Sequence, residues 1–192
     1  MNKNMKVLGF GGSLRKGSYS MALLQASAKL APNGMEIEIF NRLGEFPPYN
    51  KDMDDNPPKV VTDFKEKVKN ADAILISTPE YNYSIPGFLK NAIDWGSRPY
   101  GHNSFEGKPV ALLSSSTGSL GGSRAQYHLR QCCVFLNMYP INRPECFVGD
   151  VQKKVDDSGR LTDQGTQEKI KEVLEALAEW TKRLASGRGG SA

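Results

Sequence analysis

The chain has 192 residues, of which 39% are apolar, and its 25 basic and 21 acidic side chains give a net charge of +4. This length and composition fit one domain with a sizeable core, and the scattered charges do not indicate a nucleic-acid-binding protein. Its three cysteines and two histidines form no cluster at ligand spacing, so we expect neither a disulfide framework nor a metal site.

The N-terminal segment lacks the apolar core of a signal peptide, and no run of about 18 apolar residues occurs in the chain. We therefore expect a cytoplasmic protein that does not insert into a membrane. The first apolar run, at residues 6–11, predicts a strand that leads into the sequence GGSLRKGS at residues 11–18. A helical pattern follows, with Leu23, Ala26 and Leu30 on one face.

The segment at residues 11–18 predicts a phosphate-binding loop. Backbone N–H groups and the positive end of a helix dipole point at one place there, which favours an anion. The loop also offers glycines for close backbone approach, hydroxyl donors and a guanidinium, in Gly11, Gly12, Gly17, Ser13, Ser18 and Arg15. The alternative is an ordinary strand-to-helix turn, with Ser18 or Ser20 as the N-cap.

The rest of the chain alternates between apolar runs and helical patterns. Further strands are predicted at residues 36–40, 73–78, 109–115 and 138–141, the last continuing towards Val148. Further helices are predicted around residues 60–68, 85–93 and 125–136, and a long amphipathic helix at residues 163–184. Residues 45–58, rich in Pro, Asp and Asn, predict a long surface connection.

Five strands alternating with five helices predict an α/β fold with a parallel sheet, in one domain over residues 1–185. Residues 186–192 predict a disordered Gly/Ser tail. In parallel sheets, ligands bind beyond the carboxyl ends of the strands. The loops at residues 11–18, 78–84 and 114–122 follow the first, third and fourth strands, so we expect them to meet at one edge of the sheet.

The loop after the third strand has the sequence PEYNYSIPG at residues 79–87. Two tyrosines beside a backbone stiffened by two prolines suit one wall of a slot for a flat ring system. The backbone N–H groups of residues 80–83 would then address the edge of that ring. A capping turn is the other interpretation, with Ser84 as N-cap and Pro86 early in the next helix, and both interpretations can hold together.

The loop at residues 114–124 is dense in hydroxyl groups and glycine, and it ends in Arg124. A low-complexity linker is one interpretation. A flexible linker is not expected between a buried strand and an amphipathic helix of a compact domain, so we favour a loop that lines a ligand. On the helix that follows, Cys132 and Cys133 lie on the apolar side, which favours core thiols over redox sensors.

These loops carry a resemblance to the NADPH-dependent FMN reductase family, and within it to the bacterial quinone and chromate reductases. The similar segments lie at residues 12–18, 79–87, 90–95, 121–124 and 127–131. The segment at residues 79–87 is the most specific of them. The resemblance extends from Val7 to about Leu184, which is nearly the whole chain.

The resemblance implies a flavodoxin-like three-layer fold with a five-stranded parallel sheet of order 2-1-3-4-5. It implies FMN at the strand ends, NADPH or NADH as co-substrate, and a homodimer or homotetramer that completes the site. Carried over residue by residue, the phosphate would lie on Ser13, Arg15, Ser18 and Ser20. The ring would lie along Pro79, Glu80, Tyr81, Asn82 and Tyr83, with Ser115, Ser116 and Gly118 on its pyrimidine side.

The function expected from this resemblance is hydride transfer from NAD(P)H to flavin N5, followed by reduction of a small-molecule acceptor. Quinones, chromate, azo compounds and nitro compounds are all expected acceptors, because reduced flavin reacts with many oxidants. The flavin carries this chemistry, so no side chain is required as a nucleophile or general base.

Arg124, Tyr127 and Glu145 are candidates for a further role. Arg124 and Tyr127 are three residues apart on a predicted helix, and Glu145 follows the next strand. We expect an ion-paired cluster at a subunit contact. The alternative places Arg124 on the NADPH phosphate or on an anionic acceptor.

A flavodoxin-type electron carrier is the alternative function, in which bound FMN passes single electrons between protein partners. Such carriers usually need an acidic docking face, and this chain is net basic. A signalling receiver would need acidic residues where Gly11, Gly12 and Ser13 stand. The glycine spacing also fails to match the G-x-G-x-x-G pattern of dinucleotide-binding dehydrogenases.

Overall fold

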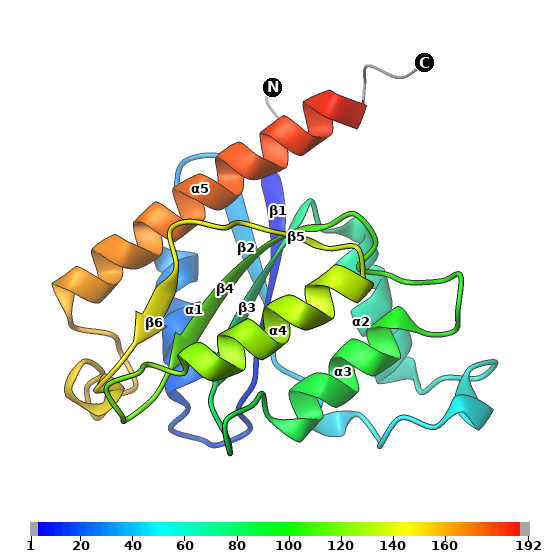
Figure 1. The fold of residues 1–192 in the computed structure, drawn as a ribbon, viewed down its shortest axis with the longest axis horizontal. Helices are drawn as coiled ribbons and strands as arrows, with labels where there is room; N and C mark the ends of the chain where they lie inside the picture. Colours follow the sequence, from blue (N-terminus) through cyan, green and yellow to red (C-terminus); the bar gives the residue numbers. More distant parts are fainter. Residues whose placement is uncertain (1–3, 189–192) are drawn as a thin grey trace.

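The structure is a computed structural model that describes residues 4–188. A parallel sheet with the order β2-β1-β3-β4-β5 forms its centre, and β6 also pairs with β4 (Figure 1). The strands are β1 (Met5–Gly11), β2 (Met35–Phe40), β3 (Ala73–Pro79), β4 (Pro109–Ser115), β5 (Tyr139–Pro140) and β6 (Cys146–Val148). This order confirms the predicted flavodoxin-like α/β fold.

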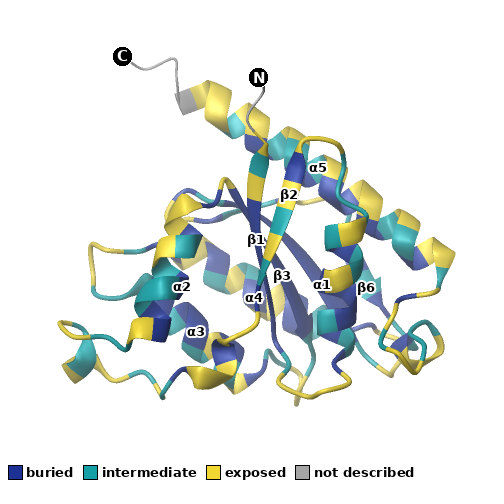
Figure 2. Ribbon diagram, turned by 180° about the vertical axis from the view of Figure 1, so that it is seen from behind, coloured by how far each residue is buried: buried dark blue, intermediate teal, exposed yellow. Residues whose placement is uncertain are grey.

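Helices cover both faces of the sheet. One face carries α2 (Lys59–Asn70), α3 (Gly87–Ser97) and α4 (Ser123–Phe135), and the other carries α1 (Tyr19–Lys29) and α5 (Gln164–Arg188). Because β3 and β4 lie between the two helical layers, nearly all of their residues are buried, whereas the edge strand β2 is partly exposed (Figure 2). The two faces therefore pack two separate apolar cores.

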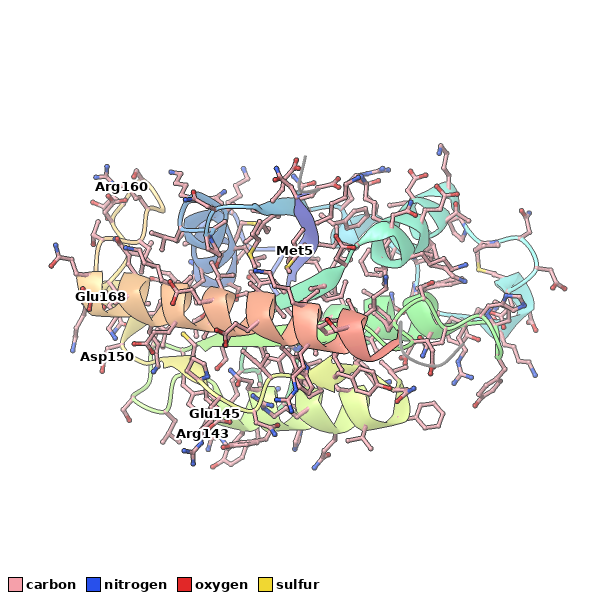
Figure 3. The ribbon with its side chains drawn as sticks, turned by 90° about the horizontal axis from the view of Figure 1, so that it is seen from above. Met5, Arg143, Glu145, Asp150, Arg160 and Glu168 are labelled. Carbon is pink, nitrogen blue, oxygen red and sulfur yellow. The ribbon has the colours of Figure 1, made fainter. Side chains whose placement is uncertain are left out.

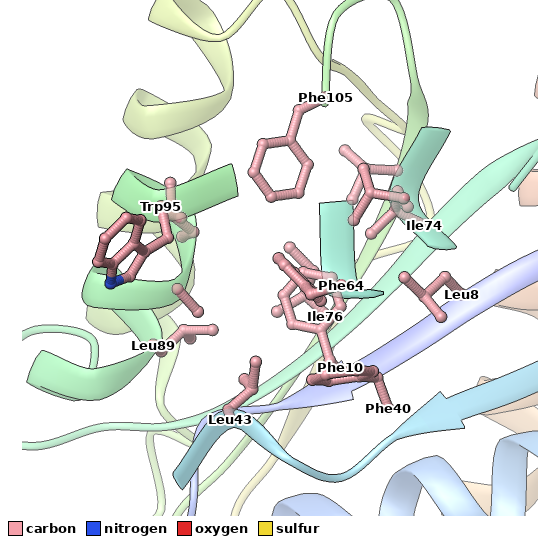
Figure 4. Packing of buried hydrophobic residues seen from close by; sticks show 14 of the residues in the cluster. Leu8, Phe10, Phe40, Leu43, Phe64, Ile74, Ile76, Leu89, Trp95 and Phe105 are labelled. Carbon is pink, nitrogen blue, oxygen red and sulfur yellow. The ribbon is translucent and has the colours of Figure 1, made fainter. Parts of the chain in front are cut away.

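The core beneath α2 and α3 contains a group of aromatic rings among its aliphatic side chains (Figure 4). Phe64 of α2 packs edge-on against Phe10 of β1, with 5.2 Å between ring centroids, and also contacts Phe105. Gly96 of α3 lies against the Phe105 ring, where an added Cβ would come within 2.4 Å of it. A larger residue at position 96 would therefore separate α3 from this core.

The fifth position of the sheet differs from a single regular strand. The short strands β5 and β6 pair with opposite ends of β4, at Pro109 and at Leu113, and residues 141–145 between them leave strand geometry. Viewed from above, α5 lies along the molecule with Met5 on one side and Glu145 on the other (Figure 3). No helix within residues 4–188 is both long and apolar enough to cross a bilayer.

Three local expectations need correction. The connection at residues 45–58 is not wholly irregular, because 3-10 helices form at Leu43–Glu45 and Lys51–Met53, the second capped by Asn50. Residues 186–188 belong to α5, which continues the amphipathic pattern past Leu184, so the expected tail begins later. Its remaining residues, 189–192, lie outside the described residues.

The third correction concerns the start of α3. Ser84 does not cap this helix, and the residue at the N-cap position is Pro86 itself. Ser84 is instead held by the turn before it, as described below. The start of α1 is as predicted, because Ser18 accepts a hydrogen bond from the backbone N–H of Met21 at 3.1 Å.

Candidate functional site

The loops that follow β1, β3 and β4 meet at one edge of the sheet, at the bottom of Figure 1. Gly11 at the end of β1 is in register with Ser77 of β3, and Pro79 at the end of β3 is in register with Ser115 of β4. The three strands therefore end at nearly the same level along the sheet, and the expected convergence of the loops that follow them is confirmed.

The first loop leaves β1 in close contact with the end of β3. Gly12 donates its N–H to the carbonyl of Ser77 at 2.8 Å. A Cβ on Gly12 would come within 2.9 Å of Thr78 Oγ1 and 3.1 Å of Leu89 Cδ2. Only glycine fits this approach without displacing its neighbours, so the contact fixes where the first loop begins relative to the loop after β3.

The first loop also presents unused hydrogen-bond donors. Within the described residues, the backbone N–H groups of Lys16, Gly17, Tyr19 and Ser20 donate no hydrogen bond. The Ser20 hydroxyl is buried and has no partner either. Unpaired donors at a helix N-terminus, together with a buried hydroxyl, fit the oxygen atoms of a phosphate group.

The other candidate phosphate ligands have different surroundings. Arg15 is exposed, and its guanidinium lies 4.8 Å from the centre of the Tyr19 ring. Ser13 Oγ accepts a weak hydrogen bond from the N–H of Arg15 at 3.4 Å. Ser18 already uses its side-chain oxygen to cap α1, so its hydroxyl hydrogen is the part left for a ligand.

The loop after β3 contains a tight turn at residues 81–84. Tyr81 and Ser84 exchange two backbone hydrogen bonds, of 2.9 and 3.0 Å. The central residues Asn82 and Tyr83 both have positive φ, of 50° and 67°, as in a type I′ turn. The rings of Tyr81 and Tyr83 are exposed at this edge. Because the N–H of Tyr81 is used within the turn, it is not available to the edge of a ring, in contrast to the expectation.

Glu80 precedes this turn, and its side chain points away into a buried contact with α4. Its Oε1 accepts a hydrogen bond from Nε of Arg124 at 2.6 Å, and its side chain is only 7% exposed. This hydrogen bond raises the pKa of the Arg124 guanidinium above its ordinary value. Arg124 also lies over the Tyr83 ring, 3.7 Å from its centre.

The loop between β4 and α4 is fixed along β6. Ser116 donates its N–H to the carbonyl of Val148 at 3.0 Å, and its own carbonyl accepts from Val151 at 3.1 Å. Gly118 donates its N–H to Ser116 Oγ at 3.1 Å, while Ser115 is buried as the last residue of β4. These bonds rule out the flexible linker that the composition of this segment had left open.

The cluster expected around Arg124 is arranged differently in the structure. Tyr127 donates its hydroxyl to Glu145 at 3.3 Å, but the cation nearest to Glu145 is Arg130, with 3.8 Å between Nε and Oε1. Arg124 pairs with Glu80 instead, because Arg124 lies at the start of α4 beside the turn.

The sequence analysis did not identify three residues of α4 that organise this region. Besides Arg130, Gln126 is fully buried and donates to Ser114 Oγ and to the Cys146 carbonyl, at 3.2 and 3.1 Å. His128 Nδ1 lies 3.0 Å from Ser84 Oγ. A polar side chain at the core-facing position 126 was the available signal for Gln126. The other two lie in the segment at residues 127–131 that carries the family resemblance, but nothing in that segment indicated their partners.

The cysteines are unsuited to nucleophilic chemistry. Burial raises the pKa of Cys133 to about 12 and that of Cys146 to about 11, and burial also raises the pKa of Cys132. All three are therefore thiols near neutral pH. The prediction of core thiols is confirmed for Cys133, whereas Cys132 is only partly buried.

Comparisons with known proteins agree with this geometry. The family model described as NADPH-dependent FMN reductase matches residues 5–153. The chain is 49% identical over 185 residues to an NAD(P)H-dependent FMN reductase of Pseudomonas aeruginosa, covering 96% of this chain and 99% of the relative. It is 41% identical over 187 residues to a quinone reductase of Escherichia coli, with the same coverage.

A solved structure shows the same arrangement. The flavoenzyme FerB of Paracoccus denitrificans, an NAD(P)H:(acceptor) oxidoreductase, superimposes with a TM-score of 0.85 at 34% identity. The superposition covers 93% of this chain and 98% of that one. The match therefore extends over nearly the whole chain.

Proposed function

Because this chain belongs to the NADPH-dependent FMN reductase family, an oxidoreductase family that uses FMN and NAD(P)H, we propose that it transfers electrons from NAD(P)H to quinones. The observation that carries the proposal is the first loop, where unpaired backbone donors and the buried Ser20 hydroxyl converge beside β1. The relatives described as quinone reductases support the choice of acceptor.

The residues of the first loop would hold the FMN phosphate. Ser20 and the N–H groups at the start of α1 supply hydrogen bonds, Ser13 adds a hydroxyl and Arg15 adds charge. The hydroxyl hydrogen of Ser18 is a further donor.

The tricyclic ring would lie between the turn at residues 79–83 and the loop at residues 115–118. Bound flavin supplies the redox chemistry, with hydride from NAD(P)H entering at N5 and two electrons then leaving to an acceptor on the same face. The N–H groups of Ser116 and Gly118 are used within the protein. Negative charge on the reduced ring would therefore be stabilised by the N–H of Thr117 between them, which donates no hydrogen bond within the described residues.

The surroundings of the ring favour flat acceptors. Leu14, Tyr81 and Tyr83 are large side chains that are at least half exposed at this edge. Such side chains form an apolar wall for an aromatic acceptor such as a quinone. Chromate, azo compounds and nitro compounds are further proposed acceptors, because electron transfer from reduced flavin does not require a specific bond to the oxidant.

Self-association is proposed through α4. Its outer side exposes Tyr127, Val134 and Phe135, at 50%, 81% and 75%. Exposed apolar side chains grouped on one helix are typical of an interface. A homodimer or homotetramer built on this helix would place a second subunit beside the turn at residues 81–84.

The test is the visible spectrum of the purified protein before and after anaerobic NADPH. We expect flavin absorption bands that bleach on addition of NADPH and return when a quinone is added. A protein that takes up no FMN after incubation with it would contradict the proposed cofactor site. Flavin bands that persist in NADPH and in NADH would instead favour an electron carrier, which is reduced by a protein partner.

A further inference from the structure

We propose that Glu80 positions the ring-binding turn by clamping it to α4 through Arg124, and that its side chain does not itself bind the flavin. This inference rests on the proposed function and concerns the same site. It assigns separate parts of the protein to the two ends of the cofactor, the first loop to the phosphate and this clamp to the ring.

The carboxylate of Glu80 is occupied on both oxygens. Oε2 accepts from the backbone N–H groups of Arg124 and Ala125, at 3.1 and 3.3 Å. Oε1 accepts from the Arg124 side chain, with Nε at 2.6 Å and Nη2 at 2.5 Å. A carboxylate with these three hydrogen bonds and the ion pair has little capacity left for a ligand.

The start of α4 explains why this carboxylate is needed. The residue at the N-cap position is Gly122, which has no side chain to accept from the first N–H groups of the helix. Glu80 takes over this role from a different loop, 44 residues earlier in the sequence. The negative carboxylate also lies at the positive end of the helix dipole.

Arg124 connects the Glu80 carboxylate to the turn. Its guanidinium covers the Tyr83 ring at 3.7 Å from the centroid, and Glu80 holds it there. Tyr83 and Asn82 have positive φ, a conformation that is unfavourable at non-glycine residues and persists when neighbouring groups impose it. His128 contacts Ser84 at the other end of the turn. The first two turns of α4 therefore hold the ring-binding turn from outside.

The experiment compares FMN with riboflavin, which has the same ring but no phosphate. The apoproteins of the wild type, of Glu80→Gln and of Arg124→Ala would each be titrated with both flavins. We expect both variants to bind FMN and riboflavin more weakly than the wild type does. The affinity should fall by the same factor for both flavins, about tenfold, because the clamp acts on the shared ring. Arg124→Ala leaves the carboxylate of Glu80 in place as the cap of α4, so it tests the clamp even if Glu80→Gln fails to fold.

Two controls separate the clamp from a purely structural role. Arg160→Ala removes a more exposed arginine–carboxylate pair, with Asp156 at 3.1 Å in another part of the molecule, and should leave both affinities unchanged. Thermal unfolding of the apoprotein reports how far each variant is destabilised as a whole. A loss of riboflavin affinity measured well below the unfolding temperature therefore supports the clamp.

Other outcomes would overturn the inference. If Arg124→Ala is folded and binds riboflavin as the wild type does, the clamp does not position the ring. If it weakens FMN but not riboflavin, Arg124 acts on the phosphate end instead. A wild-type protein that binds neither flavin would refute the proposed function itself, a result that differs from any defect confined to the variants.

Discussion

Two arginines in the loops at the sheet edge have different surroundings. Arg124 is held by Glu80 and by the Tyr83 ring. Arg15 has no ion pair within the described residues, and its contact is with the face of the Tyr19 ring. A guanidinium that is already paired with a carboxylate loses that pair when it binds an anion. Arg15 has no such pair to lose. Arg15 is therefore the arginine suited to bind a phosphate.

We predict that Arg15→Ala weakens FMN binding by about 1.5–3 kcal/mol, the usual contribution of a hydrogen bond to a charged group. Riboflavin binding should not change, because riboflavin lacks the phosphate. The neighbouring substitution Lys16→Ala is the matched control, since it also removes one positive charge. Equal losses in the two variants would point to general electrostatic attraction, and retention of FMN by Arg15→Ala on dialysis would remove Arg15 from the phosphate site.

At the scale of elements, the loop between β4 and α4 depends on the glycine at position 121. This residue has a φ of +59°, and a Cβ on it would lie 2.7 Å from the backbone carbon of Phe147. Gly159 has a φ of +81° with nothing within 4 Å of an added Cβ. The two positions share the conformational requirement but differ in packing. Gly121 lets the loop approach the end of β6.

We predict that Gly159→Ala lowers the free energy of unfolding by about 1 kcal/mol, the cost of a positive φ alone. Gly121→Ala should cost about 3 kcal/mol, because the backbone of the loop or of β6 must also move. Urea denaturation of the two variants measures the difference. Equal costs would show that the loop can relax away from β6.

The sequence predicts elements well where one run of residues is enough to form them. The strand at Pro109–Ser115 has the predicted bounds, because both of its faces are covered and its whole run is apolar. The fifth strand could not be predicted as two pieces, since β5 and β6 are defined by their pairing with β4. The convergence of the three loops follows from strand order alone.

The contacts within the site were much less predictable than the loops. Glu80 and Arg124 are 44 residues apart, and no pattern in either segment indicates that they pair. The pairing of Arg130 with Glu145 likewise depends on how α4 crosses the end of the sheet. Sequence spacing predicts partners on one helix, but it does not predict partners that tertiary packing brings together.

At the scale of the whole molecule, the buried thiols of the two cores make the stability of the folded protein depend on pH. Cys133 belongs to the core beneath α2 and α3, and Cys146 to the core beneath α1 and α5. Burial raises their pKa values to about 12 and about 11 in the folded protein. The unfolded chain releases these protons from about pH 8.5, so each thiol stabilises the folded state below that pH and less as the pH rises towards the folded pKa.

We predict that the free energy of unfolding falls between pH 8 and pH 10, with each buried thiol contributing about 2 kcal/mol to the fall. In Cys133→Ala the fall should be smaller by that amount, because one titrating group is gone. Urea denaturation at pH 8 and at pH 10 measures the fall in the free energy of unfolding of each protein. Because the two pH values are compared within one protein, the constant cost of the substitution cancels. An equal fall in both proteins would show that Cys133 can ionise in the folded state.

The dependence of the flavin-side loop on β6 has a consequence for biosynthesis. The segment that holds Ser116 and Gly118 includes Val148 and Val151, which are among the last quarter of the chain to be translated. A nascent chain can form β1 to β4 and the phosphate loop before that segment has emerged from the ribosome. We therefore expect the proposed cofactor site to be complete only after the C-terminal part of the polypeptide has been released.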